Sequence, residues 1–466
     1  MMIDNKEKLF VYILESWATT KNPFNSTKDL LAWLEEMNTH AKVNIQKLPY
    51  QYDGFWHYDK EALGIVNDQN SYFQIKGIRL KHEEGILEQP IIVQDGIGYL
   101  GIITKVIDGV LYFLMQAKLE PGNINGYQIS PTIQATKSNF TRVHGGKEPA
   151  FYRYFANKEN YMIIADQIQS EQSSRFLGKR NRNIILCVEE EMEIPPTHKW
   201  MTLGQIKELM HHDNLINMDA RSVISCIPFA MRNLSNELLE RVRPLFKEPS
   251  FFQSMFYGDS AQSLIDIYQY MNDFKMLKTY EKELIDLNSV KGWKFENGEY
   301  ISDHSSFKII YCDIEIEGRE VQHWQQPLLE AIGMSEFGLI YRKHSDGVMQ
   351  FLVQAKSEVG CFDKIEIAPS IQKEPIDQRI ENEVDQIFFD QLEKQKGIAL
   401  RTVLSEEGGR FYHEENYNTI MEIEDDALTS LPSGYFWVDF QTLNTLIQFN
   451  NCLNIQLRNL ISLLNL

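Results

Sequence analysis

The sequence predicts an α+β protein built from two tandem copies of one unit, and three observations support this fold class. Short polar signatures recur at a nearly constant spacing. Apolar runs of strand length flank Asp-Gly turns, and apolar residues at helical spacing close each unit. The chain has 466 residues, about three times the usual domain length, which leaves room for more than one compact unit.

The repeat is visible when the second half of the chain is laid on the first. "QAKLEPG" from Gln116 matches "QAKSEVG" from Gln354. "RFLGKRNRN" from Arg175 matches "RFYHEENYN" from Arg410, at almost the same distance along the chain. A displacement that stays nearly constant over such a long stretch indicates a duplicated module, and its period is too long for a solenoid.

The match also sets the expected boundaries. It predicts one module over residues 51–240 and a second over residues 285–466, joined by a polar junction over residues 241–284. Residues 1–50 precede the first module, and residues 376–400 are a charged, Gln-rich stretch within the second. We expect both of these stretches to be helical additions.

Each module should contain a central hairpin. Two apolar runs flank Asp108-Gly109, and their copies flank Asp346-Gly347; Asp-Gly is the strongest short signal for a hairpin turn. The strand after each turn is almost wholly apolar, so both of its faces should be covered. Because side chains alternate along a strand, Gln116 and Lys118 should share one face at its end.

Helices should close each module. The segment from Thr202 to Gln205 has the form of a capping box, and apolar residues follow it at helical spacing. A second helix should begin at Asn217, and its copy at Asn454, because Asn is a preferred N-cap residue. We expect these apolar stripes to be core rather than cofactor sites.

Charge and cysteine usage narrow the class of protein. The net charge is −19, and such a surface repels phosphate backbones, so nucleic acid is not expected as a partner. The sequence begins with scattered charges and contains no apolar run long enough to span a bilayer, so we predict neither a signal peptide nor a membrane span. Five scattered cysteines without a CxxC pair indicate a cytoplasmic chain without a zinc site.

Common catalytic signatures are absent from the sequence. It contains no Gly-rich dinucleotide loop, no phosphate loop, no GxSxG and no HExxH. His211-His212-Asp213 is a weak metal candidate, because adjacent residues on a helix do not face one point. The basic residues between Arg175 and Arg182 could hold a diphosphate or could have a structural role. We therefore predict no metal and no cofactor.

The segment "PTIQATKSN" (residues 131–139) is unusually rich in hydrogen-bonding groups. Donors and acceptors at nearly every position are typical of a site for a hydroxylated, charged ligand. The alternative is a loop network that braces the strand ends. Since the pattern occurs in both copies, a bracing role explains part of it.

Longer strings carry a family resemblance. "QPIIVQDGIGYLGII", "DGVLYFLMQAKLEPGNINGYQISPTIQATKSNF" and "QSEQSSRFLGKRNRN" closely resemble the nucleoside-diphosphate-hexose 2,3-dehydratases of deoxysugar biosynthesis. The resemblance covers nearly the whole chain, including the duplication. It implies two Nudix-like modules per subunit, a homodimer, a dTDP-4-keto-6-deoxyglucose-type substrate, and a downstream 3-ketoreductase that acts on the product. The hydrolase signature of Nudix enzymes is missing from both halves.

The reaction that the resemblance implies needs only proton transfers. The C4 ketone acidifies the C3 proton, a base removes this proton, and the C2 hydroxyl leaves as water. The enzyme must supply a base, an acid for the leaving group, and donors for the enolate oxygen. Lys118 with Glu120, and Lys356 with Glu358, are the candidate catalytic pairs. The sequence leaves open which copy is catalytic.

The resemblance also implies substrate contacts from both halves, with the second half supplying much of the nucleotide-sugar site. Trp56 and Trp293 could stack on the thymine or could belong to the core. The two glycines of "EEGGRF" would let backbone amides approach a phosphate. The candidate substrate-binding residues are Trp56, Pro131, Thr132, Ile133, Gln134, Ala135, Ser170, Trp293, Arg342, Gln354, Ala355, Lys356, Gln372, Lys373, Glu407, Gly408, Gly409 and Arg410.

Two other functions stay open at this point. A hydrolase or transferase acting at the diphosphate of a nucleotide sugar would need carboxylates in Nudix-box spacing, which the sequence does not contain. A non-catalytic protein that binds a sugar nucleotide would keep the fold and lose the chemistry. The Lys/Glu pairs retained in both copies speak against this second alternative.

Overall fold

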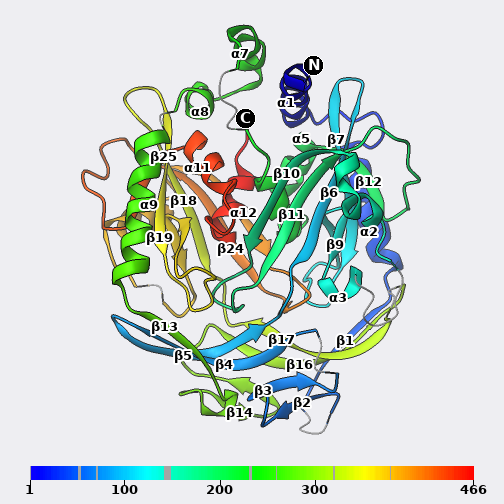
Figure 1. The fold of residues 1–466 in the computed structure, drawn as a ribbon, viewed down its shortest axis with the longest axis vertical. Coiled ribbons are helices and arrows are strands. Elements are labelled where there is room, and N and C mark those ends of the chain that lie inside the picture. Colours follow the sequence, from blue (N-terminus) through cyan, green and yellow to red (C-terminus); the bar gives the residue numbers. More distant parts are fainter. Residues whose placement is uncertain are drawn as a thin grey trace.

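Two mixed β-sheets, one in each repeat, stand side by side in the computed structural model (Figure 1). The structure describes residues 2–50, 54–69, 72–140, 148–229, 234–258, 260–318, 321–377 and 379–466. The first core sheet consists of β6 (Gly98–Ile107), β7 (Val110–Leu119), β8 (Tyr127–Ser130), β9 (Ile133–Ala135), β10 (Met162–Ser170), β11 (Arg180–Cys187) and β12 (His198–Thr202). The second consists of β18 (Glu336–Lys343), β19 (Met349–Lys356), β20 (Glu366–Pro369), β21 (Ile371–Lys373), β22 (Ile398–Ser405), β24 (Glu415–Glu422) and β25 (Tyr435–Asp439).

The two core sheets have the same topology. The strand order is β10-β11-β6-β7-β12 in the first and β22-β24-β18-β19-β25 in the second. The short strands β8 and β9 pair with β7 and β6, and β20 and β21 pair with β19 and β18 in the same way. The predicted α+β duplication is therefore confirmed as a mixed α+β fold with a repeated strand order.

The two central hairpins differ in their turns. In the first, Ile107 pairs with Val110, and Asp108 and Gly109 both have positive φ, as the predicted two-residue turn requires. In the second, only Gly347 of the Asp-Gly pair has positive φ, and the ladder ends at Lys343 and Met349. The second strand pair is therefore closed by a longer loop instead of a two-residue turn.

Helices cover the face of each sheet that points toward the other repeat. They are α5 (Leu203–Met210), α6 (Met218–Ser225), α11 (Phe440–Ile447) and α12 (Ile455–Leu463). The predicted capping box at Thr202 and the predicted N-caps at Asn217 and Asn454 are all present. Helices α6 and α12 pack against each other, and one hydrophobic core runs through both repeats. The two repeats therefore share a single core.

The outer face of each core sheet carries its own smaller cluster. Short helices α3 (Lys137–Phe140) and α4 (Tyr152–Ala156) belong to the first repeat, and α10 (Glu383–Glu393) to the second. Tyr154 and Phe155 fill the first outer cluster, and Phe388 the second. The prediction of a helical addition over residues 376–400 is wrong at its end, where Ile398 already starts β22, because pairing with β24 makes it part of the core sheet.

A second layer of strands lies below the core sheets in Figure 1. One sheet contains β2 (Trp56–Asp59), β3 (Gly64–Asn67), β4 (Gln74–His82), β5 (Gly85–Val93) and β13 (Tyr280–Ile285). The other contains β1 (Val43–Leu48), β14 (Lys294–Glu296), β15 (Glu299–Ile301), β16 (Phe307–Ile316), β17 (His323–Ala331) and β23 (Phe411–Tyr412). Strand β13, which directly precedes the second repeat, thus belongs to the sheet of the first repeat. Strand β1, which precedes the first repeat, belongs to the sheet of the second.

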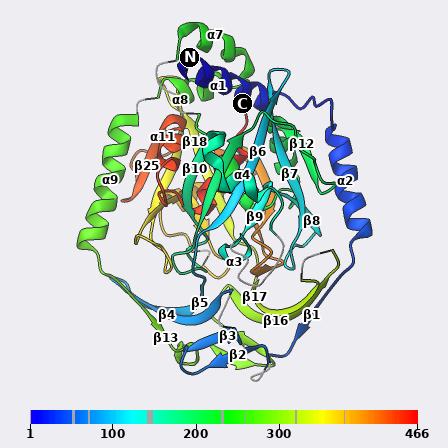
Figure 2. The ribbon, with the colours of Figure 1, turned by 45° about the vertical axis from the view of Figure 1, so that its right-hand side comes forward.

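These exchanged strands follow long helices on opposite sides of the molecule (Figure 2). Helix α2 (Thr27–His40) leads into β1, which pairs with β16. Helix α9 (Ser260–Leu277) leads into β13, which pairs with β4. The expected helical addition over residues 1–50 contains α1 and α2 but ends in a strand, because β16 offers an unpaired edge to Val43–Leu48.

The remaining helices gather near the two ends of the chain. They are α1 (Met2–Ala18), α7 (Asn236–Val242) and α8 (Pro249–Phe256) (Figure 1). The 3₁₀ turn η2 (Arg243–Leu245) follows α7, whereas η1 (Lys158–Asn160) contacts β10 and η3 (Leu287–Ser289) contacts β3 and β4. Helix α1 packs on β7 and α5. Within the described ranges, no helix combines the length and the apolar character needed to cross a bilayer.

Candidate active site

The repeated "QAK" motifs lie at the ends of the equivalent strands β7 and β19, and a glutamate follows each of them. In the first repeat, Lys118 Nζ lies 2.9 Å from Glu120 Oε1. Gln134 on β9 donates from Nε2 to the same Glu120 oxygen at 3.2 Å. Asn217, the N-cap of α6, donates from Nδ2 to Gln134 Oε1 at 3.1 Å. A hydrogen-bonded series thus runs from the carboxylate to the start of the helix.

The second repeat builds the same series. Gln372 on β21 donates from Nε2 to Glu358 Oε1 at 3.0 Å. Asn454, the N-cap of α12, donates from Nδ2 to Gln372 Oε1 at 2.8 Å. The same polar residues therefore orient one glutamate in each copy, and this explains why "QAK" and the later Gln recur together.

Each of these glutamates is covered by a loop from the other repeat. The amide of Gly122 donates to the carbonyl of Gly408 at 2.7 Å. In the equivalent contact, the amide of Gly360 donates to the carbonyl of Ser173 at 2.8 Å. The loop "EEGGRF" of the second repeat therefore closes over Glu120, and the loop "EQSSRF" of the first repeat closes over the glutamate of the second.

These contacts define two half-sites that are related by the internal repeat. The first half-site consists of Lys118, Glu120, Gln134, Asn217, Asp219, Lys179, Glu407 and Arg410. The second half-site consists of Lys356, Glu358, Gln372, Glu374, Asn454, Arg175, Glu406 and Glu414.

An arginine stacked on a phenylalanine lines each half-site. The guanidinium of Arg410 lies 4.2 Å from the centre of the Phe73 ring, and that of Arg175 lies 4.2 Å from the centre of the Phe307 ring. Arg175 also donates to Glu374 Oε2 at 2.8 Å. Stacking fixes both planar cations, together with the ion pair of Arg175 and the hydrogen bonds that Arg410 donates to Gln94 and to the carbonyl of Gly409. This suits them to orient charged groups beside the glutamates.

The first half-site is internally paired. Lys118 is held by Glu120, and Lys179 donates to the carbonyl of Gly96 at 2.7 Å. Burial, together with the charge of Glu120, raises the pKa of Glu407 to about 7. Burial and three neighbouring carboxylates also raise the pKa of Asp219 well above its usual range. Three acidic side chains therefore compete for few cations in this half-site.

The second half-site leaves its lysine free. Within the described part of the chain, Lys356 Nζ has no ion-pair or hydrogen-bond partner. Glu358 keeps a partly exposed surface, while burial of its carboxyl, opposed by the charge of Lys356, raises its pKa to about 7. Burial acts to raise the pKa of Glu374, but the charge of Arg175, the hydrogen bonds from Ser306 and Arg175 and the charge of Lys356 together lower it. The second half-site thus offers one ionised and one titrating carboxyl beside a free ammonium group.

Buried polar atoms without partners accumulate around the two half-sites. Among the described residues, they include Ser170 Oγ, Glu171 Oε2, Asp219 Oδ1, Glu366 Oε1 and Glu414 Oε2. Buried polar atoms are nearly always hydrogen-bonded in native proteins. Their concentration where the two repeats meet points to the groups of a bound ligand. No cluster of three or more His, Cys, Asp or Glu side chains in the described ranges has the arrangement of a metal site.

Several candidate binding residues of the first repeat brace the fold. Thr132 Oγ1 accepts from the Ile103 amide at 2.9 Å and donates to the Leu114 carbonyl. Pro131, Ile133 and Ala135 are buried beside it. Ser370 makes the same pair of bonds in the second repeat. The loop-bracing alternative therefore describes this part of the polar signature.

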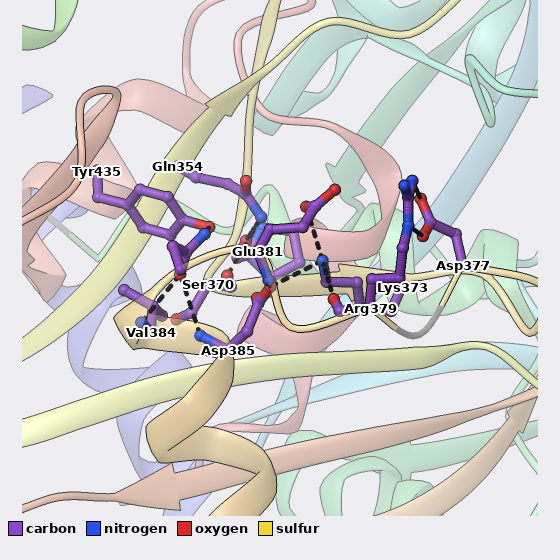
Figure 3. A network of polar contacts seen from close by, with 11 residues as sticks. Gln354, Ser370, Lys373, Asp377, Arg379, Glu381, Val384, Asp385 and Tyr435 are labelled. Atoms are coloured by element: carbon purple, nitrogen blue, oxygen red, sulfur yellow. Dashed lines mark hydrogen bonds and ion pairs between the residues drawn. The ribbon is translucent and has the colours of Figure 1, made fainter.

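Lys373 and Gln354 are engaged on the outer side of the second sheet (Figure 3). Lys373 Nζ forms ion pairs with Glu381 at 2.7 Å and with Asp385 at 2.8 Å. Gln354 donates to the carbonyl of Pro369 at 2.9 Å, and Ala355 donates from its amide to a backbone carbonyl. These side chains hold α10 and β20 against the sheet, whereas Gln372 faces the second half-site.

The two tryptophans lie behind the arginine-stacking rings. Trp56 is buried with its ring centre 4.7 Å from that of Phe73. Trp293 lies 5.1 Å from Phe307 and 5.3 Å from Tyr300. Both therefore belong to the core of the strand layer, in agreement with the core alternative considered for them.

Arg342 lies at the other end of the second sheet. It stacks on Trp437 at 4.2 Å and pairs across the strands with Gln350. Gln350 lies near the start of β19 and Lys356 at its end. At about 3.3 Å per residue, Arg342 beside Gln350 is therefore about 20 Å from Lys356. The structure does not bring it to either half-site.

The basic residues between Arg175 and Arg182 are divided between the inside and the surface. Arg175 and Lys179 are buried in different half-sites, while Arg182 pairs with Asp166 through Nε at 2.6 Å. Of the His211-His212-Asp213 run, Asp213 accepts from the amide of Val403 at 2.9 Å.

Three carboxyls of the second half-site, Glu374, Glu406 and Glu414, are not among the residues that the sequence predicts for a site. A signal for Glu414 was present in the internal alignment. The register that places Arg175 on Arg410 also places Lys179, a member of the same basic run, on Glu414.

Comparison with known proteins agrees with this architecture. The family model described as NDP-hexose 2,3-dehydratase matches residues 27–227 and 264–464. These two stretches begin within helix α2 and helix α9, and each contains one core sheet.

Three relatives cover nearly all of the chain, and each is named dTDP-4-dehydro-6-deoxy-alpha-D-glucopyranose 2,3-dehydratase. The relative from Saccharopolyspora spinosa is 33% identical over 99% of this chain and 95% of its own length. That from Amycolatopsis orientalis is 33% identical over 97% and 92%. That from Streptomyces violaceoruber is 32% identical over 92% and 95%.

The chain belongs to the NDP-hexose 2,3-dehydratase family. The family resemblance and the lyase function predicted from the sequence are thereby confirmed.

Proposed function

We propose that this enzyme removes water across C2 and C3 of a dTDP-4-keto-6-deoxyglucose-type nucleotide sugar, and that the second half-site performs the chemistry. The substrate class is supported by the names of three relatives that align over nearly the full chain. The choice of half-site rests on one observation. Lys356 is without a partner among the described residues and lies beside a glutamate of raised pKa, whereas Lys118 is paired with Glu120.

Glu358 is the proposed base. A general base works best when its pKa lies near the working pH, and the pKa of this carboxyl is raised to about 7. Gln372 holds one of its oxygens at 3.0 Å, which leaves the other oxygen to take the C3 proton. The side chain keeps an exposed surface, so a substrate can reach it.

Lys356 is the proposed donor for the enolate oxygen. When the C3 proton leaves, negative charge moves onto the C4 oxygen, and a nearby cation stabilises that charge more in the transition state than in the ketone. A lysine that is already paired would have to break that contact first. Arg175, fixed by Glu374 and Phe307, is placed to orient a further anionic or hydroxyl group of the substrate.

The reaction product provides the direct test. The protein should be incubated with dTDP-4-keto-6-deoxyglucose, a 3-ketoreductase and its nicotinamide cofactor, and the nucleotide sugars should be followed by mass spectrometry. We expect a 2,6-dideoxy-4-keto sugar nucleotide, formed equally well in EDTA because the mechanism uses only proton transfers. Release of dTMP would instead indicate a diphosphate hydrolase, and an unchanged but bound sugar would indicate a binding protein.

We also propose that the enzyme is a cytoplasmic homodimer and that each repeat is a Nudix-like module. Support for the dimer and for the module type comes from the family resemblance; a mixed sheet between helical layers in each repeat is compatible with the module type. Light scattering at micromolar concentration should give about twice the mass of the 54.4 kDa chain. A monomer at that concentration would contradict the proposed assembly.

A further inference from the structure

Glu414 is a buried carboxyl in the second half-site that the proposed base and enolate donor do not use. It lies between β23 and β24 and is only 4% exposed. Its Oε2 accepts no hydrogen bond from the described residues. Its backbone is fixed, because the amide of Glu406 donates to its carbonyl at 2.9 Å. A carboxyl held this deeply with a free oxygen is costly unless it serves a ligand.

The internal repeat places Lys179 where Glu414 stands. The register that aligns Arg175 with Arg410 also aligns these two positions. Lys179 is occupied by the carbonyl of Gly96 in the first half-site. The second half-site thus has an acid with an unpartnered oxygen at the position where the first has a paired cation. The two copies therefore differ in the kind of group that could move a proton.

Glu414 and Glu358 face the same ion pair. The charges of Arg175 and Glu374 act on both carboxyls, and these two residues are joined at 2.8 Å. Burial, opposed by Arg175 and reinforced by Glu406 and Glu374, raises the pKa of Glu414 to about 8. At neutral pH this carboxyl therefore carries a proton that it can donate.

The other carboxyls of the second half-site are less free. Glu406 accepts from Asn416 Nδ2 at 2.7 Å, and Glu374 is ion-paired. Glu366, which lies nearby, has one unpartnered oxygen, but its Oε2 accepts from Ser173 Oγ at 2.9 Å. Glu366 is therefore the alternative that an experiment has to separate from Glu414.

We propose that Glu414 is the general acid that protonates the departing C2 hydroxyl, an inference that rests on the proposed dehydration. Glu358 takes the C3 proton, and the C–H electron pair forms the enolate on the C4 oxygen. That pair then forms the C2–C3 double bond as the C2–O bond breaks. The leaving hydroxide takes the proton of Glu414 and departs as water. Glu358 ends protonated and Glu414 ionised, and exchange with solvent restores both.

A change of leaving group tests this role. Glu414→Gln keeps the shape of the side chain and removes its acidic proton. On the natural substrate we expect turnover to fall about 100-fold, the usual range for loss of a general acid. On the analogue with fluorine in place of the C2 hydroxyl, turnover should fall only a few-fold, because fluoride leaves without being protonated. Such activity also shows that the variant is folded.

Two further variants complete the experiment. Glu414→Asp keeps an acid and should recover part of the activity on the natural substrate. Glu366→Gln should not distinguish the two leaving groups. The inference is overturned if Glu414→Gln loses activity equally on both substrates, if it loses none, or if Glu366→Gln alone shows the difference between them.

Solvent exchange separates this inference from the choice of base. In deuterated water, Glu414→Gln should still exchange the C3 proton of the substrate, since Glu358 remains. Glu358→Gln should lose both exchange and turnover. If Glu358→Gln keeps C3 exchange, the proposed base is wrong, whatever the leaving-group result for Glu414→Gln.

Discussion

The first and second half-sites share the same hydrogen-bonding network but differ in how their charged groups are paired. Each has a glutamate held by Gln and by the Asn cap of a helix. In the first half-site, Lys118 forms an ion pair with Glu120. In the second, Lys356 has no partner among the described residues and Glu358 titrates near neutral pH. The comparison indicates that duplication preserved the positioning network, while the charges around it diverged.

Hydrogen bonds between the two repeats also connect the two half-sites. Arg221 of the first repeat donates to the carbonyl of Ser405 at 2.7 Å, and Arg458 of the second donates to the carbonyl of Ser170 at 2.5 Å. Each arginine therefore fixes the start of a loop of the other repeat, and that loop covers the glutamate of the arginine's own repeat. Neither half-site can be complete without both repeats, which is why the repeats share one core instead of forming separate domains.

The largest effect is expected where the covering loops meet. A methyl group at Gly360 would lie 1.9 Å from the carbonyl oxygen of Phe176, and one at Gly122 would lie 1.6 Å from that of Phe411. Since backbone has to move in either case, each Gly→Ala change should lower the free energy of unfolding by more than about 4 kcal/mol. Urea unfolding monitored by circular dichroism measures this.

Gly347→Ala is the matched control for that prediction. Gly347 has a φ of 86° and nothing within 4 Å of an added methyl group. Its substitution should therefore cost only about 1–3 kcal/mol of backbone strain. Equal losses at Gly347 and Gly360 would mean that the contact between the repeats is unimportant for stability.

A smaller effect, about tenfold per pH unit, is expected in the pH dependence of catalysis. Below pH 7 Glu358 is protonated and cannot act as a base, so kcat/KM should rise with pH toward about 7. Above about pH 8 it should fall again, because Glu414 then loses the proton that it donates. Glu407 in the first half-site also has a pKa of about 7, so it is the necessary control. Rate profiles between pH 5.5 and 8.5 should keep the rising limb in Glu407→Gln. If Glu407→Gln lost that rising limb, the catalytic base would have to be assigned to the first half-site.

Features that depend on local pattern could be predicted from the sequence. The duplication, the first Asp-Gly turn, the caps at Thr202, Asn217 and Asn454, and the shared position of the "QAK" motifs all follow from short-range signals. These features need only periodicity, turn chemistry and internal alignment.

Contacts between the repeats could not be predicted from local sequence patterns. The loop from Glu407 to Arg410 covers the first half-site instead of the site of its own repeat, and Arg175 does the reverse. Likewise, nothing within residues 43–48 reveals that they pair with β16, which follows the whole first core sheet along the chain. Such pairings are decided by which edges and loops meet after both repeats have packed.

Side-chain roles also depended on tertiary packing. Lys373 has the position and charge of a binding residue in the sequence, but two carboxylates of the α10 region hold it on the outer face. Arg342 precedes the hairpin loop and so lies at the opposite strand end from the "QAK" motif. Residue type alone did not distinguish these two from Gln372, which faces the second half-site.

The most direct test of the asymmetry compares one substitution in both half-sites. Glu358→Gln and Glu120→Gln make the same change in side chains that have the same hydrogen-bonding network. Turnover of dTDP-4-keto-6-deoxyglucose should fall about 100-fold or more in Glu358→Gln, the usual range for loss of a general base. It should stay within a few-fold of wild type in Glu120→Gln. The reverse result, or equal losses in the two variants, would contradict the assignment of catalysis to the second half-site.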